Sequence, residues 1–203
     1  MTMSHPRPPV DARLATVSLL AALSACGGGG GSDAPDARAP AAAAPAPALA
    51  PGVAGNRATC NLADFRAQAL ARVNSYRAAG ASCGEQGTFP PAPALAWNDA
   101  LTQASLGHSD DMMALNFFSH TGSSGSSVGQ RATAAGYMWS TVGENIAAGQ
   151  STVDSVMAGW LASPGHCANL LNARFRDIGL ACVSGTASNS YRTYWTMTLG
   201  AAR

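Results

Sequence analysis

Apolar side chains recur at helical spacing along the middle of the chain and become strand-like toward its end. The first such stretch predicts a helix from residue 62, with Asn61 as its N-cap and Gly80 as its C-terminal stop. Its apolar positions follow a period near 3.6 residues; they are Leu62, Phe65, Ala69, Leu70, Val73 and Tyr76.

Further helices are predicted over 98–116, with Asn98 as cap, over 128–135, and over 151–161, where Pro164 and Gly165 end the pattern. The period then changes, because 177–183 and 191–199 have the β-branched and aromatic composition of strands. Helices first and strands last predict an α+β layered domain, and no internal repeat is visible.

The N-terminal 25 residues have the pattern of an export signal. Arg13 precedes an apolar stretch of about 12 residues, too short for a bilayer core that needs roughly 20. The stretch ends in Leu23-Ser-Ala-Cys26, which resembles a bacterial lipobox, so we expect Cys26 to be lipidated and to become the mature N-terminus. The alternative is a short apolar stretch followed by a free thiol, and Asp11 argues mildly for it.

Composition separates a tether from a domain. Residues 26–58 are mostly Gly, Ala and Pro with little to bury, which predicts a disordered spacer, and 59–203 then form one domain. The chain has 12 Arg, no Lys and 11 acidic residues. Nucleic-acid binders need clustered cations, so this class of partner is not expected.

Four further cysteines would meet an oxidising compartment after export, where disulfides persist. Four cysteines allow three pairings. We expect Cys60–Cys83, joining the ends of the first helix, and Cys167–Cys182, joining a post-helix loop to a strand. A metal site is the competing use, but the sequence has no Cys-x-x-Cys pair.

The candidate chemistry lies in three segments at element ends or beside glycines, where scaffolds often place functional side chains. His120 follows the second helix, Glu144 sits in Gly143-Glu-Asn-Ile-Ala147, and His166 ends Trp160-Leu-Ala-Ser-Pro-Gly-His166. His108 falls mid-helix on a different motif and is expected to be a buried structural residue.

The ordered segments Asn116-Phe-Phe-Ser-His-Thr-Gly122, Gly143–Ala147 and Trp-x-x-Ser-Pro-Gly-His166 resemble the CAP superfamily, the cysteine-rich secretory proteins, antigen 5 and pathogenesis-related 1. The resemblance implies an α+β fold, a three-layer α-β-α sandwich with a small antiparallel sheet. It also implies a cleft lined by two His and two Glu. His120, Glu144 and His166 match three of these positions, while Ser163 stands where many members carry the second Glu.

Two functions follow from the resemblance. The first is an extracytoplasmic binding module for a lipid, small molecule or partner protein, held at the membrane only by its lipid anchor and expected to be a monomer. The second is a metal-assisted hydrolase acting on peptide or envelope material. In that case His120 and His166 could bind a divalent ion such as zinc through two ring nitrogens, while Glu144 orients a ring or accepts a proton.

Overall fold

The structure is a computed structural model that describes residues 57–203. The predicted export signal, the lipidation of Cys26 and the tether before residue 57 lie outside the described residues. Between residues 57 and 203, every helix is too short or too polar to cross a bilayer.

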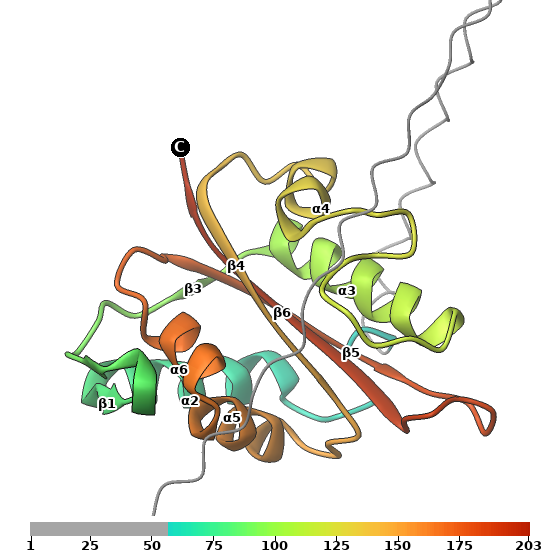
Figure 1. The fold of residues 1–203 in the computed structure, drawn as a ribbon, viewed down its shortest axis with the longest axis horizontal. Helices are drawn as coiled ribbons and strands as arrows, with labels where there is room; N and C mark the ends of the chain where they lie inside the picture. The colour runs from blue at the N-terminus through green and yellow to red at the C-terminus, as the bar shows by residue number, and fades with distance from the viewer. Residues whose placement is uncertain (1–56) are drawn as a thin grey trace, which may run out of the picture. The chain divides into compact units, whose positions relative to one another are not determined.

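A four-stranded sheet lies between two layers of helices (Figure 1). Figure 1 shows α3 and α4 on one side of the sheet and α2, α5 and α6 on the other. The strands, in spatial order, are β3 (Ala96–Trp97), β5 (Asp177–Ser184), β6 (Thr193–Ala202) and β4 (Trp139–Ala148). The α+β sandwich is confirmed. The sheet differs in one respect from the expectation, because the short β3 pairs in parallel with β5.

The helices form largely where the hydrophobic period predicts them. They are α2 (Phe65–Ala79), α3 (Asp99–Ala114), α4 (Val128–Ala134), α5 (Val153–Ala162) and α6 (Pro164–Leu171). The Asn98 side chain caps α3 by accepting from the Leu101 N–H, and Gly80 ends α2, as predicted. The predicted cap at Asn61 is wrong: its φ is +58°, and the chain enters the helix only after Asp64.

Several elements go beyond the sequence prediction. Residues 139–148 form β4, although Gly, Glu and Asn in its centre are all disfavoured in strands. Pro164 does follow the end of α5, but it also opens α6, because proline suits the first position of a helix. A small hairpin of β1 (Ala81–Ser82) and β2 (Thr88–Phe89), with the 3-10 turn η1 (Gly84–Gln86) between them, follows α2.

The two disulfides join Cys60 to Cys182 and Cys83 to Cys167, so both predicted pairs, Cys60–Cys83 and Cys167–Cys182, are wrong. The physical reason is the length of α2. Its 15 residues span about 22 Å, whereas disulfide-bonded Cα atoms lie within about 7 Å of each other.

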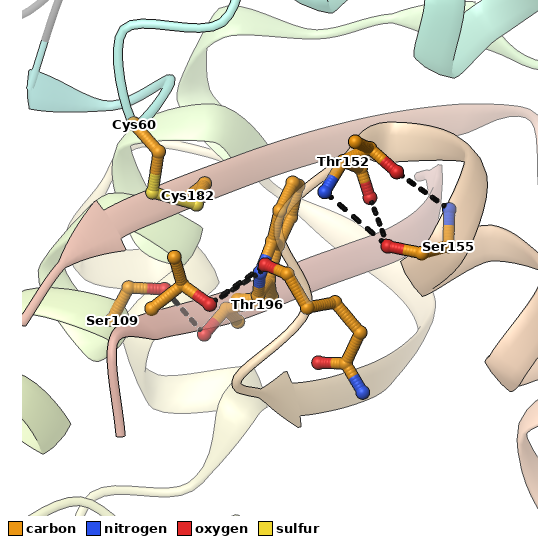
Figure 2. Close-up of a disulfide and its surroundings, with 9 residues drawn as sticks. Cys60, Ser109, Thr152, Ser155, Cys182 and Thr196 are labelled. Atoms are coloured by element: carbon orange, nitrogen blue, oxygen red, sulfur yellow. Dashed lines mark hydrogen bonds between the residues drawn. A yellow bond between two sulfur atoms is a disulfide. The ribbon is translucent and has the colours of Figure 1, made fainter.

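Backbone pairing brings Cys60 to Cys182, since the Cys60 N–H donates to the Cys182 carbonyl at 3.0 Å. Figure 2 shows the disulfide that joins the two residues. The bridges close chain separations of 122 and 84 residues. In the chain-entropy model a disulfide that closes a loop of about 100 residues stabilises the folded state by about 4.7 kcal/mol. The shorter loops of the two predicted pairs would contribute less.

β4 is an edge strand, with no strand from residues 57–203 paired on its outer side. Side chains from α5 and α6 contact its backbone there. The Trp160 indole N–H donates to the Ile146 carbonyl at 3.0 Å, and the Asn169 amide donates to the Glu144 carbonyl at 3.1 Å. Side chains thus satisfy edge carbonyls that would otherwise be open to another strand. The same contacts place α6 beside the strand that carries Glu144.

Candidate functional site

Glu144 is the buried centre of a polar cluster on β4. Its side chain is 3% exposed, and one carboxylate oxygen, Oε2, accepts from Arg131 Nη2 at 2.6 Å. Arg131 comes from α4, which Ser127 and Gln130 hold in place with a capping box. A buried carboxylate is costly unless it is paired, so the guanidinium makes this burial tolerable.

His120 projects from the loop after α3 and meets the other oxygen of the same carboxylate. Its Nδ1 lies 2.8 Å from Glu144 Oε1, while its side chain is 57% exposed. Because a carboxylate accepts, Nδ1 donates the proton, and the neutral ring then keeps its lone pair on Nε2. No hydrogen bond within residues 57–203 engages that Nε2. Glu144 therefore orients the ring so that one nitrogen is open to a ligand.

His166 lies in the first turn of α6, on the opposite helical layer. Its Nδ1 is 2.9 Å from Ser163 Oγ. Burial is the main cause that lowers the pKa of His166, and the electrostatic effect of nearby His120 lowers it further. The backbone carbonyl of His166 accepts from the amide of Asn145, the residue after Glu144, at 3.1 Å. The site therefore spans the β4 edge, with one histidine from each side.

An open cavity of about 340 Å³ adjoins His166. Its other lining residues are mostly apolar, and none of them carries a formal charge. They are Phe118, Ile146, Ala147, Ala148, Gln150, Val156, Gly159, Trp160, Ser163 and Tyr191. Phe118 and Tyr191 are 44% and 40% exposed, with ring centroids 5.8 Å apart. The buried Oε1 of Gln150 has no hydrogen-bond partner among the described residues.

The donor set partly fits a metal ion. His120 and His166 each have one ring nitrogen engaged by a neighbour and could offer the other, whereas zinc takes about four ligands. Both oxygens of Glu144 are already engaged, and the described chain contains no group of three or more His, Cys, Asp or Glu side chains suited to an ion. A metal held here would need water or a ligand to complete its coordination.

The structure brings the three predicted residues to one region, with His120 and Glu144 in direct contact. His108 is fully buried, as predicted, yet it also belongs to the cluster, because its Nε2 lies 3.9 Å from Glu144 Oε1. Sequence reasoning missed Arg131. The available signal was that, in a chain with no Lys, a buried carboxylate can be paired only by Arg or His among the cationic side chains.

A helix–sheet–helix sandwich with a histidine–carboxylate pair on its edge strand defines a structural class rather than one activity. The family model described as CAP, the cysteine-rich secretory protein family, matches residues 70–199, which is 130 of the 203 residues. The chain belongs to this family.

The relatives share only part of their length with this chain. The uncharacterized protein YkwD and the uncharacterized membrane protein YlbC, both from Bacillus subtilis, are 35% and 33% identical to it over 86 residues. That segment is 42% of this chain but only 34% and 25% of theirs. The chain thus spans about a third or less of these relatives, whose whole-protein activities do not transfer to it.

Two solved structures are similar to part of this chain. An extracellular SCP-domain protein from Bacillus anthracis is 33% identical, with a TM-score of 0.46, and the match covers 54% of this chain and 34% of that one. An outer surface protein from Borrelia burgdorferi is 20% identical with a TM-score of 0.50, covering 55% and 80%. The second match supports the fold alone.

Proposed function

We propose that this chain is an exported, lipid-anchored binding module whose cleft takes up an amphipathic molecule such as a lipid. The carrying observation is the cavity of about 340 Å³ beside His166. Its wall includes Ile146, Val156 and Trp160, and its other lining residues carry no formal charge. An apolar group could be buried there while a polar group reaches the imidazoles.

The contacts of the Glu144 carboxylate favour a binding function over a catalytic one. Both oxygens of Glu144 are engaged, by Arg131 and His120, and the side chain is 3% exposed. A general base needs to reach the proton that it removes, and this carboxylate is instead used to hold a ring. Ser163 occupies the position at which many CAP proteins carry a second carboxylate, and its hydroxyl contacts His166.

Export is supported by two independent features. The residues before Cys26 have the pattern of a lipoprotein signal. The domain carries two disulfides, which persist outside the reducing cytosol. Metabolic labelling with radioactive palmitate should mark the wild-type chain and leave a Cys26→Ser variant unlabelled. Equal labelling of both would remove the anchor from the proposal.

The cavity can be tested by filling it from a glycine. A Cβ atom at Gly159 of α5 would meet no atom within 4 Å, and Gly159 lines the cavity. Gly159→Leu should therefore fold normally while it obstructs the space. Gly107 of α3 is the matched control, since it is also a helical glycine with open space but does not line the cavity.

The probe is the fluorescent fatty acid cis-parinaric acid, with Cys26→Ser in every protein so that no detergent is needed. We expect saturable binding, a loss of about tenfold in affinity for Gly159→Leu, and no change for Gly107→Leu. Failure of the parent protein to bind would contradict the lipid assignment. Equal affinity in all three proteins would contradict the cavity as the site.

One observation favours metal-assisted hydrolysis as the second candidate. A carboxylate that orients a histidine, as Glu144 orients His120, is the usual outer-shell arrangement of metal-binding imidazoles. Calorimetric titration with zinc chloride should then show a site that His120→Ala and His166→Ala each abolish and that Asp99→Asn, a change to an exposed carboxylate, leaves intact. Identical titrations for the parent and both cleft variants would exclude zinc binding by this histidine pair.

A further inference from the structure

His108 makes a specific bond to the loop that carries His120. It lies in the middle of α3, is fully buried, and its Nε2 is 2.9 Å from the carbonyl oxygen of Ser119. A carbonyl can only accept, so Nε2 must carry the proton. The lone pair of the neutral ring is then on Nδ1, and Nδ1 has no partner among the described residues.

The surroundings of His108 favour this neutral form. Burial is the main cause that lowers the pKa of His108; Arg131 also lowers it, whereas Glu144, the Ser119 carbonyl and Asp111 raise it. A second proton would have to sit on Nδ1, where no acceptor is available. His108 therefore acts as a hydrogen-bond donor and not as a buried charge.

The backbone around His120 is attached to the polar cluster at two points. The Ser119 carbonyl accepts from His108, and the carbonyl of His120 itself accepts from Arg131 Nη2 at 3.0 Å. Both attachments lie next to the same carboxylate, Glu144, which holds the ring of His120. The main chain and the side chain of an exposed residue are thus held by the buried His108 and Glu144 and by the mostly buried Arg131.

The unpartnered Nδ1 indicates why an imidazole is used. A buried acceptor without a partner costs free energy that an apolar ring of similar shape would avoid. If His108 only filled space, phenylalanine would serve as well, since the ring of Phe117 already lies edge-on to it at 6.5 Å between centroids. The donor to Ser119 is what phenylalanine lacks.

We propose that His108 is a positioning residue for His120: its bond to the Ser119 carbonyl fixes the backbone from which His120 reaches Glu144. The inference concerns the same site as the proposed function, but its test requires no ligand. A failure of lipid or zinc binding would leave it standing, and its own failure would leave the cavity intact.

The test compares the full chain with three variants by nitrogen-15 NMR of the histidine rings. His108→Phe keeps a ring but removes the donor, whereas His108→Gln places an amide N–H near the original Nε2. Leu106→Ala is the control, because Leu106 is a buried residue of the same helix that packs on Ala181 and Val183, away from Ser119. The readout is the tautomer of His120, alongside the melting temperature.

In the parent chain we expect His120 as a single Nδ1–H tautomer, because Nδ1 donates to Glu144. His108→Phe should lose that single tautomer, whereas His108→Gln should keep it. Leu106→Ala should lower the melting temperature but leave the His120 tautomer unchanged. An unchanged signal in His108→Phe, or the same loss in Leu106→Ala, would overturn the proposal. If His108→Phe does not fold, the Gln variant decides: a retained tautomer supports the role and a lost one refutes it.

Discussion

The two faces of the central sheet are built from different residues. Toward α2, α5 and α6, strands β5 and β6 present large apolar side chains that belong to the main core cluster: Ile178, Leu180, Trp195, Met197 and Leu199. The residues that they present toward α3 include Gly179, Thr196 and Thr198. Ser105 and Ser109 of α3 form hydrogen bonds with these three residues. Figure 2 shows the hydrogen bond between Ser109 and Thr196 on this face.

The two faces stabilise the fold in different ways. The apolar face buries area and provides bulk stabilisation. The α3 face uses small residues, so that helix and sheet backbones approach closely, and it satisfies its hydroxyls by pairing them. Glu144 lies on this second face, because it pairs in register with Thr198. A charged cluster is more easily held where the neighbours can form hydrogen bonds.

The largest expected effect comes from adding one methyl group to the α3 face. A Cβ at Gly179 would lie 2.2 Å from the backbone of Leu101, which cannot move aside without shifting α3. Gly179→Ala should lower the free energy of unfolding by about 4 kcal/mol or more, measured by urea denaturation. Gly159→Ala, with open space around the new atom, is the control. A loss below about 1 kcal/mol would mean that the two backbones are not in close contact.

Leu180, the residue after Gly179, tests the apolar face by removing side-chain atoms instead of adding them. Leu180 is fully buried in the apolar core, and Leu180→Ala leaves a cavity there. We expect a loss of about 3 kcal/mol in the same urea experiment. Glu144, which holds the His120 ring, lies on the other face of the sheet, so the His120 tautomer should not change. A change in that tautomer would show that the two faces are not independent.

A double-mutant cycle tests how the polar face is stabilised. Ser109 Oγ donates to Thr196 Oγ1 at 2.9 Å, and both residues are fully buried. Thr196→Val keeps the shape but leaves the Ser109 hydroxyl unpaired, and should cost about 1–2 kcal/mol. Adding Ser109→Ala should recover most of that loss, because both polar partners are then gone. Strictly additive losses would mean that the pair is not a hydrogen-bonded unit.

The smallest expected effect is a pH dependence from His108. Its folded pKa lies below the ordinary value of 6.5, so between the two values the unfolded chain binds the extra proton. Stability from this group is therefore complete above pH 6.5 and falls as the pH drops below it, by at most about 1.4 kcal/mol per pH unit.

His108→Gln should have a shallower acid slope than the parent in melting temperatures measured from about pH 7.5 to about pH 5. Subtracting the two curves removes the contribution of His166, whose pKa burial also lowers. Parallel curves would show that His108 takes up no proton on unfolding in this range.

Local patterns were enough for the elements that carry their own signal. The period of apolar residues and the Asn98 cap located α3, and β-branched and aromatic composition located β5 and β6. β4 carried no such signal, because its central Gly143, Glu144 and Asn145 are poor strand formers. Its strand conformation depends on pairing with β6, far along the chain.

The order of motifs, read from the sequence alone, was sufficient to indicate the family, the sandwich and three residues of the candidate site. Only the tertiary structure decided the partners. Cys60 pairs with Cys182 because the segment before α2 runs beside β5, and Arg131 pairs with Glu144 because α4 packs on β4. Sequence periodicity reports which face of an element is buried, whereas these contacts depend on where separate elements meet in space.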